Sequence, residues 1–146
     1  MTMESGRILG IDYGEVRVGL AMTDPLQMLA SGAGFLENGP DLLAQIARRV
    51  AEEQIVRVVV GMPYAPDGGK GAAGRAIGLF VAGLAAVVRV PVETWDESGS
   101  SRKAMRALID GGAGKRKRRE KWRVDEMAAR LLLQEYLEHR EGRRGH

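Results

Sequence analysis

A run of six residues from Val56 to Gly61 (VRVVVG) is the feature that most constrains how this chain can fold. Four of the six are valines, which are β-branched, and only Arg57 interrupts the apolar sequence. Such a continuous run is typical of a central strand that is covered on both faces. A sheet with helices on both of its faces provides that cover, so the run predicts an α/β fold.

Four more strands are expected around this one. Ile8–Ile11 and Val16–Met22 are β-rich runs separated by a short turn that contains glycine, which predicts a hairpin. A weaker strand over Ala30–Glu37 completes an antiparallel meander, and PVETWDE (91–97) reads as a short strand late in the chain.

Helices are expected between and after the later strands. Asp41 is expected to cap a helix whose apolar stripe is formed by Leu42, Leu43, Ile46, Ala47 and Val50, and a second stripe contains Ile77, Phe80, Val81, Leu84 and Val88. Gly74 and Gly78, one turn apart on the second helix, suggest close packing against a neighbour. Two further helices are expected at Ser101–Asp110 and at about Trp122–His139.

The expected order of elements is therefore β-β-β-α-β-α-β-α-α. One five-stranded mixed sheet accounts for it, with three antiparallel strands followed by two parallel strands and with helices on both faces. No linker or internal repeat divides the chain, so we expect a single domain over residues 1–146, with flexible tails at 1–6 and 140–146.

Composition excludes several classes of protein. The chain has 45% hydrophobic and 28% charged residues, as ordinary globular proteins do, and it has no cysteine. Disulfide frameworks, thiolate zinc sites and cysteine nucleophiles are thereby excluded. The longest uncharged apolar run, Ala76–Val88, is well short of the ~20 residues that a membrane span requires. Residues 1–7 lack the apolar core of a signal peptide, so we expect a cytoplasmic protein without a membrane partner.

Basic residues are concentrated in one segment. Lys115–Arg123 (KRKRREKWR) contains seven basic residues and one acid, a local charge of +6, whereas the rest of the chain has 15 basic and 18 acidic residues. Such a segment suggests a polyanionic partner held by salt-dependent phosphate contacts. The alternative is a solvated basic loop that only aids solubility.

Three acids occur where this topology would gather them. Asp12 ends the first strand, Glu97 ends the last strand, and Asp125 lies on the final helix. Three and four residues after Asp125 come Ala128 and Ala129, whose small side chains would let that helix lie close to the sheet.

Carboxylates without cysteine or histidine form a hard oxygen-ligand site, which suits Mg²⁺ or Mn²⁺. Two such ions ~4 Å apart can promote in-line displacement at phosphorus.

Each acid also has a structural interpretation. Asp12 could bind backbone amides in the turn near Gly14, Glu97 and Asp96 could cap a helix, and Asp125 could complement the dipole in a first helical turn.

Four motifs, in register over about Arg7–Leu137, make the chain similar to a known family. They are GIDYGEVRVGLAMTDP, VVVGMPYAPDGG, WDES and VDEMAARLLLQEYL. In them the chain resembles the YqgF-type pre-16S ribosomal RNA nucleases, which are also described as Holliday-junction-resolvase-like proteins with a ribonuclease-H-like fold. The resemblance implies a divalent-metal-dependent endonuclease that trims the ends of the small-subunit ribosomal RNA precursor.

The resemblance also assigns residues. Asp12, Glu97 and Asp125 match the family's three acids, which would be both catalytic residues and metal ligands. Arg17 matches a basic residue of the family's first hairpin and would bind phosphate. One departure is Ser98, which stands where the family usually has arginine and puts a contact there in doubt.

Further substrate contacts are expected from the basic segment. Lys121 lies one turn before Asp125 and would bind phosphate. Lys115, Arg116, Lys117, Arg118 and Arg119 would form an arm that orders on nucleic acid. Trp122 would either stack a base or pack at the start of the helix, and we assign no role to His139 or His146.

Three other functions stay open. Asp12-Tyr13-Gly14 resembles the phosphate-binding hairpin of actin-like ATPases, although those proteins need two such domains. A non-catalytic RNA-binding assembly factor would use the basic segment alone. A Holliday-junction resolvase would need a dimer to cut symmetrically, and no self-complementary surface can be identified in the sequence. We therefore expect a monomer or weak homodimer, with precursor ribosomal RNA favoured over branched DNA as the substrate.

Overall fold

The computed structural model describes residues 5–63, 71–96 and 121–144. The predicted helix at Ser101–Asp110, together with residues 115–120 of the basic segment, lies outside these ranges.

Five strands form one mixed sheet. They are β1 (Arg7–Tyr13), β2 (Arg17–Thr23), β3 (Ala30–Glu37), β4 (Ile55–Met62) and β5 (Val92–Asp96). Their order across the sheet is β3-β2-β1-β4-β5. β1 pairs antiparallel with β2 and β2 with β3, whereas β1 pairs parallel with β4 and β4 with β5. The predicted fold, with three antiparallel strands followed by two parallel strands, is confirmed.

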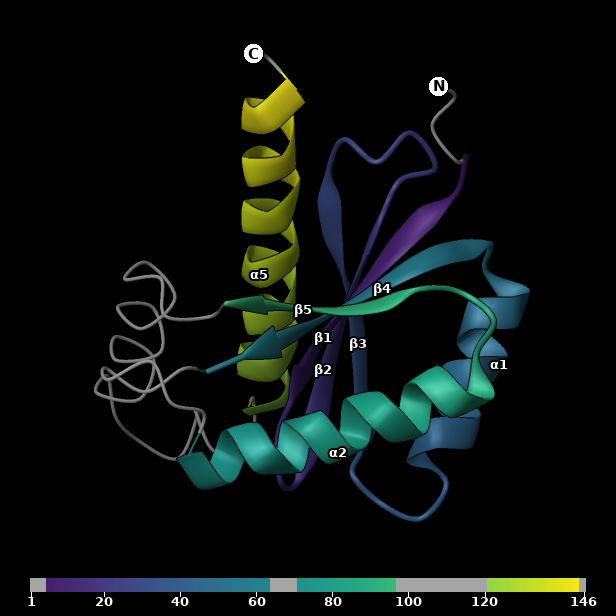
Figure 1. Ribbon diagram of the computed structural model, residues 1–146, viewed down its shortest axis with the longest axis vertical. Helices are drawn as coiled ribbons and strands as arrows, with labels where there is room; N and C mark the ends of the chain where they lie inside the picture. Colours follow the sequence, from purple (N-terminus) through teal and green to yellow (C-terminus); the bar gives the residue numbers. More distant parts are fainter. Residues whose placement is uncertain (1–4, 64–70, 97–120, 145–146) are drawn as a thin grey trace.

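Helices cover both faces of this sheet (Figure 1). α1 (Leu42–Glu52) and α2 (Gly71–Val87) lie on one face, and their buried side chains pack with Leu9 and Ile11 of β1. α5 (Lys121–Arg144) lies on the other face, where Leu133 and Leu137 pack with Ile8. Because successive residues of β1 face opposite ways, one strand contributes to both apolar clusters.

The predicted central strand, Val56–Gly61, is covered on both faces from Val58 onward. Val58, Val59 and Val60 of β4 are all 0% exposed. Val58 and Val60 belong to the cluster under α1 and α2, and Val59 belongs to the cluster under α5. The absence of polar alternation at these positions therefore has the predicted cause, which is burial on both faces.

α5 approaches the sheet closely because both surfaces are made of small residues. Ala128 and Ala129 are buried, as predicted. On the sheet, a Cβ at Gly10 would lie 3.0 Å from Cβ of Leu133, and a Cβ at Gly19 would overlap the backbone of Asp125. The helix can lie this low only where the strands carry no side chain.

Both ends of α5 differ from the interpretations made on the sequence. The helix begins at Lys121, so Asp125 is its fifth residue, and the first turn contains no acid. The dipole role considered for Asp125 is therefore not the arrangement observed.

α5 continues to Arg144, five residues past the predicted end at His139, and so includes part of the predicted C-terminal tail. Arg140, the first residue past the predicted end, lies against Tyr136 and donates a 2.9 Å hydrogen bond to Gln27.

The close packing predicted for Gly74 and Gly78 is half right. Gly74 is buried, but a Cβ at Gly78 would meet nothing within 4 Å in the part of the chain that the structure describes. Within the described ranges, no helix is long and apolar enough to cross a membrane.

Candidate functional site

Asp12 lies near the carboxyl end of β1, on the face that α5 covers. Its cross-strand partner on β2 is Gly19. Gly10, two residues earlier on β1, faces Ala129 and Leu133 of α5, so Asp12 faces the same way. The residue is 4% exposed. An ionised carboxylate buried to this extent requires compensation from its surroundings, which is why Asp12 is a candidate for chemistry.

Asp125 reaches the same place from α5. Its backbone carbonyl lies directly over Gly19, at the position a Cβ would take. One glycine therefore separates the backbone of Asp125 from Asp12 on the neighbouring strand. The Asp125 side chain is 18% exposed. The structure thus brings together two of the three predicted acids, which are 113 positions apart in the sequence.

Arg17 joins this site from the start of β2. Its Nε donates to Oδ2 of Asp125 at 3.2 Å, and the two side chains are 27% and 18% exposed. Arg17 lies two residues before Gly19 and so projects from the same face of β2. The sequence predicted a basic residue for phosphate here, and the structure adds that its guanidinium holds the Asp125 carboxylate.

Two side chains of α5 fix the helix along β3. Glu126 accepts a hydrogen bond from the backbone N–H of Gly34 at 2.6 Å, and its carboxylate lies where a Cβ of Gly32 would be. Gln134 accepts one from the N–H of Ala30 at 3.0 Å. Because Glu126 is adjacent to Asp125, the first of these bonds also sets the height of Asp125 above the sheet.

The carboxyl ends of the three parallel strands lie at one edge of the sheet. Gly61 and Met62 of β4 are aligned with Trp95 and Asp96 of β5, and Ile11 of β1 is aligned with Val60. Asp96 is therefore near the same edge as Asp12. Ligand sites in open α/β sheets lie at this edge.

The remaining predicted site residues cannot be placed. Glu97, which follows β5 directly in the sequence, lies outside the described residues, as do Lys115, Arg116, Lys117 and Arg118. Lys121 is the first residue of α5, but its side chain is not described. Among the described residues no group of three or more histidine, cysteine or acidic side chains is arranged to hold a metal ion.

A family model described as "RuvX: Holliday junction resolvase" matches residues 6–139, nearly the whole chain. The chain belongs to this RuvX family. Curated relatives agree. A protein of Chlorobium luteolum named "Putative pre-16S rRNA nuclease" is 45% identical over 138 residues, covering 94% of this chain and 97% of its own length. A protein of Porphyromonas gingivalis with the same name is 39% identical, covering 91% and 96%. The resemblance deduced from the motifs is confirmed, and with it membership of a nuclease family.

Solved structures support the RuvX-type fold. Thermus thermophilus RuvC in complex with a Holliday junction substrate superposes with a TM-score of 0.57 at 14% identity, covering 94% of this chain and 96% of that one. The fowlpox virus resolvase superposes with a TM-score of 0.53 at 16% identity, covering 91% and 97%. At this level of identity the likeness establishes the ribonuclease-H-like fold.

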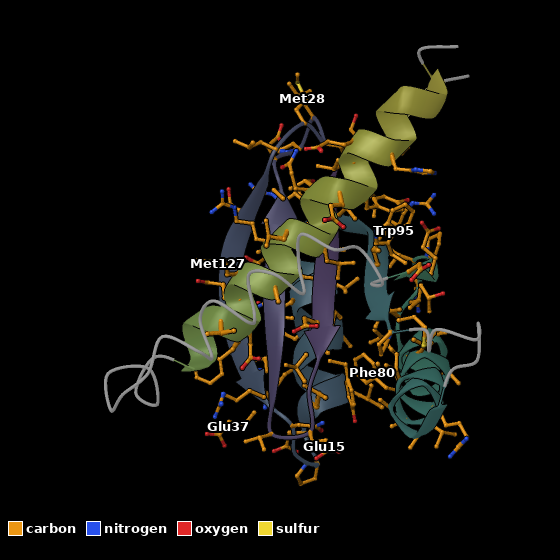
Figure 2. The ribbon with its side chains drawn as sticks, turned by 90° about the vertical axis from the view of Figure 1, so that its left-hand side faces the viewer. Glu15, Met28, Glu37, Phe80, Trp95 and Met127 are labelled. Atoms are coloured by element: carbon orange, nitrogen blue, oxygen red, sulfur yellow. The ribbon has the colours of Figure 1, made fainter. Side chains whose placement is uncertain are left out.

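Sequence reasoning on this RuvX-family chain missed a second group of side chains. Trp95 of β5 lies beside α5, as Figure 2 shows, and contacts Tyr136 and His139 there. His139 was assigned no role on the sequence. The spacing of Tyr136, His139 and Arg140 is i, i+3 and i+4, so the three share one helix face, and that spacing was the available signal.

Burial changes the chemistry of Tyr136 in this group. It raises the pKa of the Tyr136 phenol to about 12, and a hydrogen bond to the Glu93 carboxylate adds to the effect. The phenol is consequently neutral throughout the physiological range, and Glu93 is also paired with Arg57 at 2.8 Å.

Proposed function

We propose that this protein is a divalent-metal-dependent endonuclease that hydrolyses phosphodiester bonds, and that its substrate is the 5′ end of the precursor of 16S ribosomal RNA in the cytoplasm. The observation that carries the proposal is the convergence of Asp12 and Asp125 across Gly19, in a chain that belongs to a nuclease family. The names of the curated relatives supply the substrate.

The donor set fits Mg²⁺ or Mn²⁺. The two described acids offer only oxygen ligands, and the chain has no cysteine to favour a softer metal. Mg²⁺ is commonly held by one or two carboxylates together with substrate phosphates. Asp12 and Asp125 would be the ligands, with Glu97 as the third. When bound, the metal would polarise the scissile phosphate and lower the pKa of a bound water.

The chain's own side chains prepare this site. Arg17 pairs with the Asp125 carboxylate and so places a guanidinium at the site. A guanidinium binds phosphate oxygens in a planar, two-pronged geometry, so Arg17 is suited to hold the substrate backbone next to the reacting phosphate. Glu126 and Gln134 contribute by keeping α5 in register with β3.

The basic segment supplies affinity for a long polyanion. In this proposal Lys115, Arg116, Lys117, Arg118 and Lys121 contact phosphates and impose a strong salt dependence on binding. Phosphate contacts do not distinguish RNA from DNA, so the choice would rest on shape and on 2′-hydroxyl contacts.

Resolution of a four-way DNA junction is the second candidate function. The description of the matching family model favours it. The two candidates share the hydrolytic site and differ in the substrate that reaches it.

A cleavage panel tests both candidates. Labelled substrates would be a fragment spanning the 5′ end of mature 16S RNA with its precursor leader, a four-way DNA junction and a plain DNA duplex, each with Mg²⁺, Mn²⁺ or EDTA. We expect metal-dependent cutting of the RNA fragment, with little cutting of the duplex.

The other outcomes are informative. Preferential cutting of the junction would contradict the RNA substrate and support the resolvase function. Tight RNA binding without cutting in any metal would contradict hydrolysis and support the assembly-factor interpretation.

A further inference from the structure

A pocket of about 650 Å³ lies beside the edge strand β5, and its lining comes from β5, from α5 and, through Val81, from α2. Its lining includes Glu93 and Trp95 from β5 and Tyr136, His139 and Arg140 from α5. None of these residues belongs to the hydrolytic site described above. Figure 2 shows Trp95 beside α5, well separated from Met127 near the start of that helix.

Aromatic rings make up much of the lining. The Trp95 indole meets the Tyr136 ring edge-on, with centroids 5.6 Å apart and an interplanar angle of 89°. The His139 ring lies 4.9 Å from the indole centroid. Flat rings at several orientations around one cavity suit a flat, polarisable occupant, because such an occupant can stack on one ring and meet the edge of another.

The charge of the pocket favours an anionic occupant. The one acid among its described lining residues, Glu93, is paired with Arg57 at 2.8 Å. Arg140 instead donates to the neutral amide of Gln27 at 2.9 Å and lies 5.8 Å from the Tyr136 ring centroid. With no ion pair to an acid among the described residues, the guanidinium is a positive charge at the wall of an aromatic pocket.

The flat faces of the rings, rather than the indole N–H, are what the pocket offers an occupant. Nε1 of Trp95 is buried and has no hydrogen-bond partner in the part of the chain that the structure describes, so it is not exposed to the pocket. An aromatic occupant that stacks is therefore favoured. Nucleobases are flat aromatic groups of this kind.

Trp95, at one side of the pocket, projects from the same face of the sheet as Asp12. Ile11 of β1 is aligned with Val60 of β4, so Asp12 lies next to Gly61, and Gly61 is aligned with Trp95. Two strand spacings therefore separate Asp12 from Trp95, which is ~10 Å between backbones. A single nucleic-acid strand whose phosphate is at Asp12 can reach this pocket with a neighbouring base.

We propose that the pocket formed by Trp95, Tyr136, His139 and Arg140 binds an unpaired nucleobase of the substrate strand, next to the phosphate that is cut. The proposal rests on the proposed nuclease function and deepens it, because a base can enter only if it is not paired. Stacking on the aromatic rings is tolerant of base identity, and the guanidinium of Arg140 adds attraction for the nucleotide's phosphate. The enzyme would then prefer cut sites with unpaired nucleotides over continuous duplex.

Tryptophan fluorescence tests binding in the pocket directly. The chain has two tryptophans, so Trp122→Phe leaves Trp95 as the only one and keeps an aromatic ring at position 122. Asp12→Asn in the same chain would prevent turnover during the titration. We expect a single-stranded RNA oligonucleotide to quench Trp95 fluorescence, and a blunt duplex of the same sequence to leave it nearly unchanged.

Affinity measurements with pocket variants complete the test. Trp95→Leu should weaken binding of the single strand roughly 5- to 150-fold, the effect of losing one stacked base, and Trp95→Phe should restore most of it. Leu79→Ala, which truncates an exposed apolar side chain of α2, is the matched control and should bind normally. Thermal melting would establish that Trp95→Leu is folded, and Trp95→Phe still decides the matter if it is not.

The failures of the two proposals are distinguishable. Normal cleavage by wild type, with no quenching and with unchanged affinity in Trp95→Leu, would contradict base binding in the pocket and leave the nuclease proposal standing. Quenching by the single strand without any cleavage by wild type would support the pocket and overturn the nuclease. Equal quenching by single strand and duplex would contradict the requirement for an unpaired base.

Discussion

Nε of Arg17 lies 3.2 Å from Oδ2 of Asp125, and the bond joins the first residue of β2 to the fifth residue of α5 across 108 positions. It connects the amino-terminal hairpin to the carboxyl-terminal helix at the point where Asp12 is buried. The ion pair therefore helps to hold α5 against the sheet, and it also contributes charge to the candidate site.

A double-mutant cycle can measure how much the Arg17–Asp125 pair contributes to the free energy of unfolding. Arg17→Gln, Asp125→Asn and the double variant should give a coupling of about 0.5–1 kcal/mol in denaturant unfolding, the upper range for ion pairs of this exposure. The Arg49–Glu53 pair, at 3.7 Å with side chains 34% and 39% exposed, is the control and should give about 0.3–0.5 kcal/mol. Zero coupling for Arg17 and Asp125 would show that the pair does not hold α5.

Because α5 contacts Gly19 so closely, adding one methyl group at this position should strongly reduce stability. In Gly19→Ala the new Cβ would overlap the backbone of Asp125, so the helix would have to move away from the sheet. We expect a loss of about 1–3 kcal/mol in the free energy of unfolding, together with reduced cleavage. Gly78→Ala on α2, where a Cβ meets nothing within 4 Å in the described part of the chain, should instead stabilise by about 0.5–1 kcal/mol. Equal effects of the two substitutions would contradict the close approach.

Tyr136 predicts how stability responds to alkaline pH. Its pKa in the folded protein is raised to about 12 from an ordinary value of 10.0, so the folded state holds the phenol proton more tightly than the unfolded state does. Its contribution to stability is complete below pH 10 and is lost as the pH rises through the folded value. In an absorbance titration of tyrosinate, one of the three tyrosines should titrate near pH 12, and Tyr136→Phe should remove that phase. Persistence of the late phase in Tyr136→Phe would assign it to another residue.

The basic segment predicts a change in binding rather than in chemistry. Replacing Lys115, Arg116, Lys117 and Arg118 by glutamine should weaken nucleic-acid binding and flatten the plot of log affinity against log salt concentration. Cleavage at saturating substrate should persist. An unchanged slope would mean that these residues form the solvated loop considered as the alternative.

Much of the fold could be predicted because the relevant signals are local. The valines of β4 have no polar alternation since both faces are buried, and Ala128 and Ala129 are small where α5 meets the sheet. The end of α5 was predicted five residues early because the contacts of Arg140 that extend it are with Tyr136 and Gln27, and the latter lies 113 positions away. Gly78 was assigned close packing from spacing alone, which cannot reveal whether a neighbour is present.

The candidate site was predicted only in part, because some of its contacts join residues that are far apart in the sequence. Asp12 and Asp125 were identified, and Arg17 was linked to phosphate, but the Arg17–Asp125 bond depends on the height of α5 over Gly19. The Trp95 pocket was missed because it combines an edge strand with a helix face, and neither carries a motif by itself. The roles of Glu97 and the basic segment, the single domain over 1–146 and the oligomeric state stay predictions.

The most direct test of the central claim is single-turnover cleavage of the 5′ precursor RNA by Asp12→Asn, measured beside RNA affinity. Asp41→Asn is the matched control. The prediction that the Asp41 side chain caps α1 was wrong, because it makes no capping hydrogen bond at the start of that helix. We predict that Asp12→Asn binds RNA with near-normal affinity and cuts at least 100-fold more slowly (roughly the scale on which loss of one electrostatic stabiliser acts), whereas Asp41→Asn is unchanged. Cleavage by Asp12→Asn at the wild-type rate would contradict the assignment of this carboxylate to the hydrolytic site.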